Sequence, residues 1–166
     1  MNGNVPSIAA EGRHVYALRV YYEDTDAGGV VYYANYLRFA ERARTEALRA
    51  LGIPHAELVE QFRLMFVVRR VEMDYLRPAR LDDSLVVGTE VEEVGGASVR
   101  LRQTIAAADG AAADGTALTI ARVQLACVSL GEARPRRIPA RWRAGLRAMM
   151  AATDRNKGGV AGGSGG

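Results

Sequence analysis

The chain has 166 residues, of which 49% are hydrophobic and 25% are charged, and its formal net charge is +3. This balance is typical of one soluble globular domain and excludes a disordered or collagen-like chain. Its apolar runs are shorter than the roughly 20 residues of a membrane-spanning helix, and the N-terminus lacks the basic start and apolar block of a signal peptide. We therefore expect a cytoplasmic protein without a membrane span.

Composition divides the chain into three ranges. Residues 1–12 have no periodic pattern, and the chain ends in NKGGVAGGSGG, which is mostly glycine. Such segments are typical of flexible termini. We expect a disordered N-terminus over residues 1–12, one folded domain with a basic C-terminal segment over 13–152, and a flexible tail over 153–166.

The first predicted elements are a strand and a long helix. Residues 13–23 alternate apolar and polar side chains, which predicts a strand. Over residues 34–51 apolar side chains cover one half of the helical wheel and charged ones the other, and Gly52 and Pro54 predict the end of this helix. Arg44 falls in the apolar half, where it either lies at the rim with its stem buried or meets an acidic partner.

After a poorly patterned segment, HAELVEQ, the chain has four further strand patterns. They cover residues 63–76, 84–94, 98–108 and 116–130. Short turns with Gly or Asp, such as 108–115, favour antiparallel neighbours. The alternating set of the first pattern is Val67, Arg69, Val71, Met73 and Tyr75.

These elements predict an α+β fold, with one long helix against a curved antiparallel sheet of about five strands. So small a sheet leaves open edges. Open edges favour pairing with a second copy of the chain.

The last 35 residues hold most of the excess positive charge. Residues 132–157 carry eight basic and two acidic side chains. Seven of the eight are arginines, whose planar group suits phosphate or carboxylate; a solvated surface is the alternative interpretation. Nucleic acid is not an expected partner, because Trp142 is the segment's one aromatic residue.

The histidines and the cysteine do not indicate a metal or redox site. His14 and His55 lack metal-ligand spacing, and we expect both at the surface. Cys127 is the one cysteine and lies in an apolar run, so we expect it in the core.

The stretch EDTDAGGVVYY joins the first strand to the helix. Glu23, Asp24 and Asp26 are close carboxylates, and strand alternation would place the two aspartates on one face. Gly28 and Gly29 allow positive φ and a close approach to the backbone. The helix start offers unpaired N–H groups and a positive dipole end. Together these parts could supply a base or nucleophile and an oxyanion hole for ester or thioester hydrolysis; alternatively, Asp26 only caps the turn.

Two stretches resemble a known enzyme family: VYYEDTDAGGVVYYANYLRFAERARTEAL and FVVRRVEMDYLRPARLDD. They are similar to acyl-CoA thioesterases of the Tol-Pal-associated type, in the 4-hydroxybenzoyl-CoA thioesterase group of hotdog-fold proteins. The likeness spans roughly residues 15–130 and includes the motif D-x-D-x-x-G-x-V-x-Y-x-N-Y. It implies a hotdog fold, in which a sheet wraps one long helix and two copies join edge to edge, often as a dimer of dimers (a homotetramer).

The resemblance also implies a reaction and its residues. The acid aligned with Asp26 acts on a thioester carbonyl as a nucleophile or by activating water, and N–H groups around Tyr33 bind the thioester oxygen. Gly28, Gly29 and Val30 belong to the implied substrate-binding turn. Many Tol-Pal-type members have histidine at the position of Tyr33, so the resemblance carries over the N–H role, and the phenol would only shape the pocket.

The implied substrate is an acyl-CoA, hydrolysed without a metal or other cofactor, and acyl carrier protein is a further possible partner. Basic side chains near the dimer surface hold the CoA phosphates in this family, which makes Arg134, Arg136 and Arg137 the candidates here. The alternative is a module that binds acyl-CoA, acyl carrier protein or an envelope partner with little catalysis.

Overall fold

The structure, a computed structural model, describes residues 12–108 and 117–159. Residues 1–11, 109–115 and 160–166, where disorder or a turn was expected, lie outside these ranges. Gly12, the last residue of the N-terminal segment expected to be disordered, is described and buried. In chain order the described elements are β1 (His14–Arg19), the 3-10 helix η1 (Tyr22–Asp24), α1 (Asn35–Ala50), α2 (His55–Phe62), β2 (Leu64–Tyr75), β3 (Ser84–Val94), β4 (Ser98–Ala107), β5 (Ala117–Ser129) and α3 (Ala140–Gly159).

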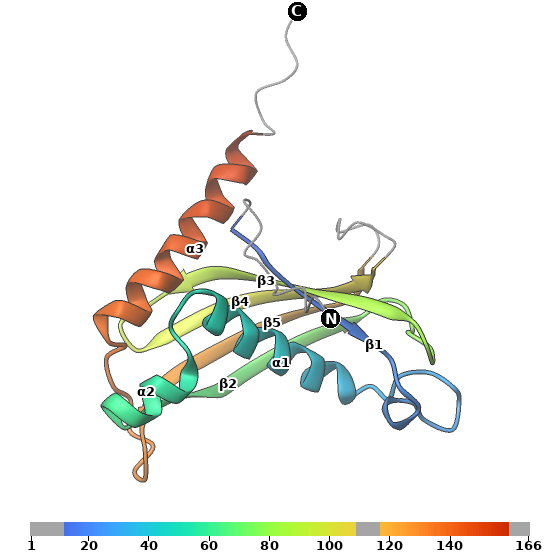
Figure 1. Cartoon of the computed structure of the whole chain (residues 1–166), viewed down its shortest axis with the longest axis horizontal. Coiled ribbons are helices and arrows are strands. Elements are labelled where there is room, and N and C mark those ends of the chain that lie inside the picture. Colours follow the sequence, from blue (N-terminus) through green and yellow to red (C-terminus); the bar gives the residue numbers. More distant parts are fainter. Residues whose placement is uncertain (1–11, 109–116, 160–166) are drawn as a thin grey trace, which may run out of the picture.

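The five strands form one sheet in the order β1-β3-β4-β5-β2, and every neighbouring pair is antiparallel. Helix α1 lies along one face of this curved sheet (Figure 1). The predicted α+β arrangement is therefore confirmed. Strands β1 and β2 form the two edges.

Helix α1 follows its predicted pattern closely. Its end has the hydrogen bonds of a Schellman motif: the N–H of Gly52 donates to Arg49 and that of Ile53 donates to Leu48, each at 3.0 Å. Gly52 has a φ of 70°, which glycine adopts without strain. The side chains that α1 buries are Tyr36, Phe39, Ala40, Ala43 and Ala47.

Arg44 is half-buried, and its guanidinium meets a buried amide rather than an acidic partner. Its Nη1 donates to Oε1 of Gln103 at 3.0 Å, and Nε2 of Gln103 donates to the carbonyl of Ala40 at 2.9 Å and to Oγ1 of Thr89 at 3.0 Å. Burial lowers the pKa of the Arg44 guanidinium. The partner of Arg44 beneath α1 is thus the buried amide of Gln103, which is itself hydrogen-bonded to the helix and to the sheet.

Strand β2 departs from simple alternation. Its register against β5 shifts between Val68 and Arg70, so that Arg69 is an extra residue in a bulge. The predicted set that included both Val67 and Val71 is therefore split between two faces. Val71 pairs with Val123 of the core, whereas Val67 pairs with Ala126.

The segment HAELVEQ, which has little pattern, forms most of helix α2. Two turns bury a single residue, Leu58, and so give too short a pattern to detect. His55 at its start was expected at the surface but is half-buried, and its Nε2 accepts a hydrogen bond from the N–H of Phe66 at 3.1 Å.

His14 is fully buried, and its predicted surface position is wrong. Strand β1 pairs with β3 so that His14 lies opposite Thr89, which is also buried. Neither imidazole nitrogen has a hydrogen-bond partner in the described part of the chain. Burial lowers the pKa of His14, and the charge of Glu46 partly opposes this effect.

Helix α3 closes the end of the core and contains the predicted basic segment. Trp142 is 1% exposed, and its ring centroid lies 5.5 Å from that of Phe62, edge to face. The helix continues to Gly159, past the predicted start of the tail at residue 153. Thr153 itself is buried, and its hydroxyl donates to the carbonyl of Gly12 at 3.1 Å. None of the described helices is long and apolar enough to span a bilayer.

Candidate active site

Residues 24–32 form a tight hairpin before α1. The N–H of Asp26 donates to the carbonyl of Val30 at 2.9 Å and closes a three-residue loop. Within it the N–H of Gly29 donates to the carbonyl of Asp26 at 3.0 Å. Gly29 has a φ of 76°, the left-handed conformation that such loops need at their last position. The left-handed conformation of Gly29 therefore allows the chain to reverse direction and enter α1.

The three carboxylates of this region have different surroundings. Strand β1 ends at Arg19, so strand alternation does not govern their directions. Oδ2 of Asp24 accepts the N–H of Tyr21 at 2.8 Å and caps η1. Oδ1 of Asp26 accepts the N–H of Gly28 at 2.8 Å. In the described chain the second oxygen of the exposed Asp26 carboxylate has no hydrogen-bond donor or ion-pair partner.

The start of α1 is open to an anion. Its N-terminal cap is Ala34, which offers no side-chain acceptor, and its first turn contains no acidic residue. Among the described residues, the N–H groups of Tyr33 and Ala34 have no backbone or side-chain acceptor. Unpaired N–H groups at the positive end of a sixteen-residue helix attract an oxygen that carries negative charge.

A group of tyrosines lines a shallow pocket beside this helix start. Its walls include Tyr33, Tyr36 and Tyr75, with Leu76 and Pro78 beyond them. The ring centroid of Tyr75 lies 6.3 Å from that of Tyr33 and 5.7 Å from that of Tyr36, both edge to face. Burial raises the pKa of both Tyr36 and Tyr75, so their phenols stay protonated at neutral pH.

The connection from β2 to β3 holds the hairpin in place. Ala79 is fully buried and donates its N–H to the hydroxyl of Tyr36 at 3.0 Å. Its carbonyl accepts the N–H of Val31 at 2.8 Å. Val30 forms an antiparallel bridge with Arg80. These bonds join the hairpin, the first turn of α1 and the β2–β3 connection into one unit.

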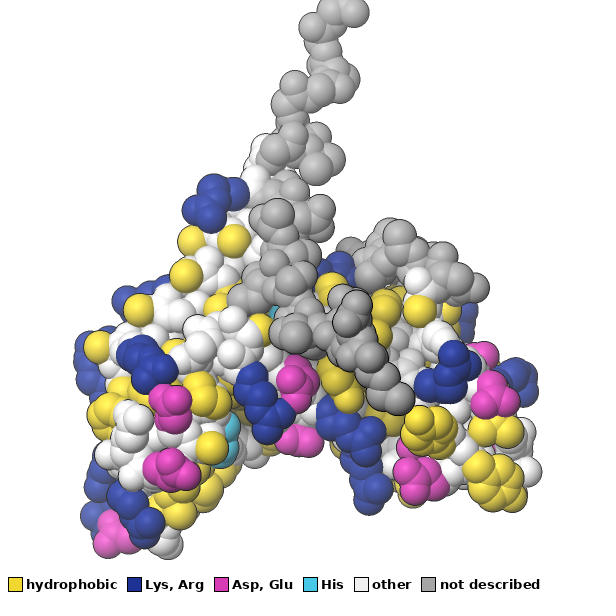
Figure 2. Space-filling view, in the orientation of Figure 1, with side chains coloured by type: hydrophobic (Ala, Val, Ile, Leu, Met, Phe, Trp, Pro, Cys, Tyr) yellow, Lys and Arg dark blue, Asp and Glu magenta, His cyan; other side chains and the backbone are white. Residues whose placement is uncertain are grey.

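Exposed apolar and aromatic side chains gather at this end of the molecule, on the right of Figure 2. Tyr22 is 82% exposed and Tyr33 is 62% exposed. An apolar surface beside a free carboxylate and open N–H groups fits an organic acyl compound rather than a small hydrated ion.

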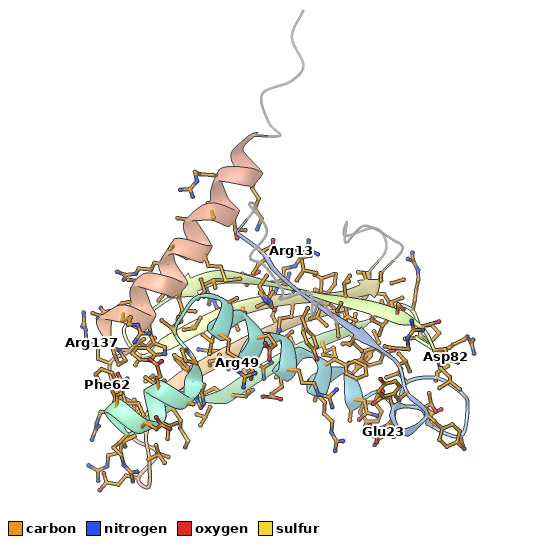
Figure 3. The ribbon with its side chains drawn as sticks, viewed as in Figure 1. Arg13, Glu23, Arg49, Phe62, Asp82 and Arg137 are labelled. Atoms are coloured by element: carbon orange, nitrogen blue, oxygen red, sulfur yellow. The ribbon has the colours of Figure 1, made fainter. Side chains whose placement is uncertain are left out.

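The predicted site residues form two groups. Asp26, Gly28, Gly29, Val30 and Tyr33 lie together in the hairpin and at the start of α1. The second group is the arginine cluster, Arg134, Arg136 and Arg137, which follows β5. This strand has thirteen residues and is roughly 40 Å long. Figure 3 shows Arg137 and Glu23 at opposite ends of the molecule.

The arginine cluster is exposed and weakly held. Nε of Arg134 lies 3.2 Å from the Glu132 carboxylate, with both side chains more than half exposed. Nη1 of Arg136 donates to the carbonyl of Pro135 at 3.1 Å. Within one protomer, these guanidinium groups cannot share a small ligand with Asp26.

Sequence reasoning missed three residues that adjoin the hairpin: Tyr36, Tyr75 and Arg80. Tyr36 belongs to the apolar half of the predicted helix and Tyr75 to a predicted strand, so the sequence pattern alone does not place them at the site. The hydrogen bond between Tyr36 and Ala79 joins positions 43 apart in sequence. The available signal was the second stretch of the resemblance, MDYLRPARLDD, which contains Tyr75 and Arg80.

Comparisons with known proteins identify relatives of this chain. The family model described as "Thioesterase superfamily" matches residues 28–113. The "Acyl-CoA thioesterase YbgC" of Haemophilus influenzae is 48% identical over 124 residues, which cover 75% of this chain and 87% of that protein. The "Acyl-CoA thioester hydrolase YbgC" of Escherichia coli O6:H1 is 45% identical over 122 residues, or 74% of this chain and 87% of that protein.

A solved structure shares both the fold and part of the sequence. The probable thioesterase from Bartonella henselae superposes with a TM-score of 0.70 at 37% identity, covering 76% of this chain and 99% of that one. The DHNA-CoA thioesterase from Staphylococcus aureus superposes with a TM-score of 0.78 at 20% identity, covering 87% of this chain and 95% of that one. At 20% identity the second likeness concerns the fold alone.

Proposed function

Because this chain belongs to the thioesterase superfamily, we propose that it hydrolyses acyl-CoA thioesters to CoA and a free carboxylic acid. This proposal rests on the hairpin. It places the Asp26 carboxylate, which has one oxygen without a hydrogen-bond partner among the described residues, next to the uncapped start of α1. The relatives named as acyl-CoA thioester hydrolases support it, since they match three quarters of the chain.

Asp26 begins the reaction by one of two routes. As a general base it takes a proton from water, and the resulting hydroxide attacks the thioester carbon. As a nucleophile it forms a mixed anhydride that water then cleaves. In both routes the C–S bond breaks, and the CoA thiolate leaves and takes up a proton.

The carbonyl oxygen gains negative charge while the tetrahedral intermediate forms. In our proposal the N–H groups of Tyr33 and Ala34 bind this oxygen, helped by the dipole of α1. Gly28, Gly29 and Val30 let the substrate approach the hairpin backbone. The phenol of Tyr33 shapes the acyl pocket and transfers no proton.

The functional unit of our proposal is a dimer joined through β2. This strand has twelve residues at a sheet edge, and Val68 and Val71 on it are 48% and 36% exposed. A long unpaired edge with apolar side chains favours a second copy of itself. Antiparallel pairing of the two β2 strands would complete a continuous ten-stranded sheet.

Such a dimer would also give the arginine cluster a role. The Tyr75 end of β2 is next to the hairpin, and the Leu64 end is next to the arginine cluster, since Leu130 donates its N–H to the carbonyl of Arg63. Antiparallel pairing brings the Leu64 end of one copy beside the Tyr75 end of the other. The arginine cluster of one protomer could then hold the CoA phosphates of a substrate bound at Asp26 of its partner.

A thiol-release assay tests the proposed activity. Purified protein is mixed with short, long and aromatic acyl-CoA thioesters, and the free CoA thiol is followed with a disulfide reagent. Hydrolysis of at least one class, lost in Asp26→Asn, supports the enzyme. Tight binding without any thiol release would instead support an acyl-CoA or acyl-carrier-protein binding module.

The sequence resemblance extends the proposal further. It supports a cytoplasmic enzyme associated with the Tol-Pal system, a homotetramer built as a dimer of dimers, and acyl carrier protein as a second carrier of the thioester. Sedimentation analysis distinguishes a dimer from a tetramer. Acyl carrier protein thioesters belong in the same thiol-release panel.

A further inference from the structure

The side chain of the last residue of β2 forms a hydrogen bond with the backbone just before α1. The hydroxyl of Tyr75 donates to the carbonyl oxygen of Tyr33 at 2.9 Å. The two residues are 42 positions apart, so the pairing depends on the fold of the sheet around α1 and not on local structure.

This bond fixes one peptide unit. A peptide is planar, with its C=O and N–H pointing in opposite directions. The carbonyl of Tyr33 and the N–H of Ala34 belong to the same unit, so the phenol that holds the carbonyl also sets the direction of the N–H. A rotated peptide would instead present a partially negative carbonyl oxygen at the helix start.

We propose that Tyr75 is the positioning residue of the oxyanion-binding peptide between Tyr33 and Ala34. The inference rests on the proposed thioesterase function and adds a side chain to it. Tyr75 does not touch the reacting atoms. It acts through the peptide, whose N–H would bind the thioester oxygen.

The surroundings of Tyr75 suit this role. Its ring packs edge to face against Tyr33 and Tyr36, which limits rotation of the phenol. Burial raises its pKa, so the hydroxyl remains a donor throughout the neutral range. A donor on the C=O also polarises the peptide and strengthens its N–H as a donor in turn.

Other bonds hold the surrounding backbone independently of Tyr75. The hydroxyl of Tyr36 accepts a hydrogen bond from the N–H of Ala79, and the N–H of Val31 donates to the carbonyl of Ala79. Loss of the Tyr75 hydroxyl should therefore free the Tyr33–Ala34 peptide without unfolding the hairpin. The predicted effect is on the rate of the chemical step rather than on stability.

The test compares Tyr75→Phe with Tyr32→Phe, which removes a phenol whose contacts are with the side chain of Tyr33 and not with the Tyr33–Ala34 peptide. We expect Tyr75→Phe to lower kcat about ten-fold with little change in KM, as for one lost hydrogen bond. Tyr32→Phe should keep the wild-type kcat. Incorporation of 3-fluorotyrosine at position 75 keeps the ring and the hydroxyl and should keep kcat near wild type.

A spectroscopic measurement reports on the peptide directly. Infrared difference spectra give the thioester C=O stretch of an acyl-CoA bound to Asp26→Asn, which should not turn over. Adding Tyr75→Phe to this variant should move the stretch toward its frequency in free solution, because the oxygen is less polarised.

The outcomes separate the two proposals. A wild-type protein that hydrolyses no acyl-CoA would contradict the proposed function itself. An active wild type whose Tyr75→Phe variant keeps its kcat, changes only KM, or leaves the C=O frequency unmoved would overturn the positioning role alone. If Tyr75→Phe melts well below the wild type, the 3-fluorotyrosine protein is used in its place. A loss of kcat in that protein, which keeps the hydroxyl, would also overturn the positioning role of Tyr75.

Discussion

The N–H of Gly28 donates to Oδ1 of Asp26 at 2.8 Å, so one oxygen of this exposed carboxylate is held in the hairpin while the other faces solvent. An amide oxygen can accept the same bond as a carboxylate oxygen. Asparagine at position 26 would therefore keep the hairpin while removing the negative charge.

Asp26→Asn should abolish turnover and leave the fold intact. We expect the thiol-release rate to fall by at least the roughly 10²–10⁴-fold of a lost general base. Circular dichroism and thermal melting should match the wild type, because the bond to Gly28 remains. An Asn variant with normal kcat would refute the assignment of Asp26.

Gly29→Ala tests the left-handed turn of the hairpin. A side chain at its φ of 76° costs about 1–2 kcal/mol, and relief of this strain would move Asp26. The matched control is Gly52→Ala, which has a φ of 70°, equally open space and a place at the far end of α1. Both variants should lose similar stability in urea, whereas only Gly29→Ala should lose kcat. If Gly29→Ala and Gly52→Ala lose kcat equally, the conformation of the hairpin has no specific role in catalysis.

Charge reversal of Arg134, Arg136 and Arg137 should raise KM for acyl-CoA with little change in kcat. An acyl-pantetheine thioester lacks the CoA phosphates, so its KM should not respond. Arg80→Glu is the competing variant, because Arg80 lies beside Val30 in the same protomer. If only Arg80→Glu raises the KM for acyl-CoA, Arg80 and not the arginine cluster binds the CoA phosphates.

Subunit mixing tests whether the arginine cluster acts across the dimer. Co-expression of Asp26→Asn with the triple arginine variant produces heterodimers, in which one site has both an intact Asp26 and the intact cluster of its partner. At low acyl-CoA concentration the mixture should be more active than either parent. Activity no greater than that of the parents would exclude a shared site.

His14 should make folding depend on pH. Its pKa is lowered by burial, whereas the unfolded chain binds this proton near pH 6.5. Stability should then be constant above that pH and fall below it, by at most roughly 1.4 kcal/mol per pH unit. Urea unfolding at pH 7.5 and 5.5 should show a smaller loss in His14→Leu than in the wild type. Some loss remains in the variant, because burial also lowers the pKa of His55.

The sequence predicts best what depends on neighbours along the chain. The end of α1 at Gly52 follows from local chemistry, and so does the hairpin with its left-handed Gly29. Burial of His14 depends on the pairing of β1 with β3, which is a non-local contact. The bulge at Arg69 likewise depends on the register of β2 against β5.

The candidate site shows the same division. Asp26 and the start of α1 are close in sequence, so one motif contains both. Tyr75 reaches the carbonyl of Tyr33 only after β2 has taken its place at the sheet edge. The arginine cluster was predicted from its charge to hold the CoA phosphates, but its distance from Asp26 depends on the fold, because the cluster follows the end of β5.

Trp142 gives this molecule a built-in optical probe. It is the one tryptophan of the chain, and its side chain is buried between α3 and the core, in contact with Phe62. Phe62 lies at the opposite end of the molecule from Glu23 (Figure 3). The fluorescence of Trp142 therefore reports the packing of α3 on the core, at a place distant from Asp26. Unfolding of the core and thiol release at Asp26 can therefore be measured as two separate signals.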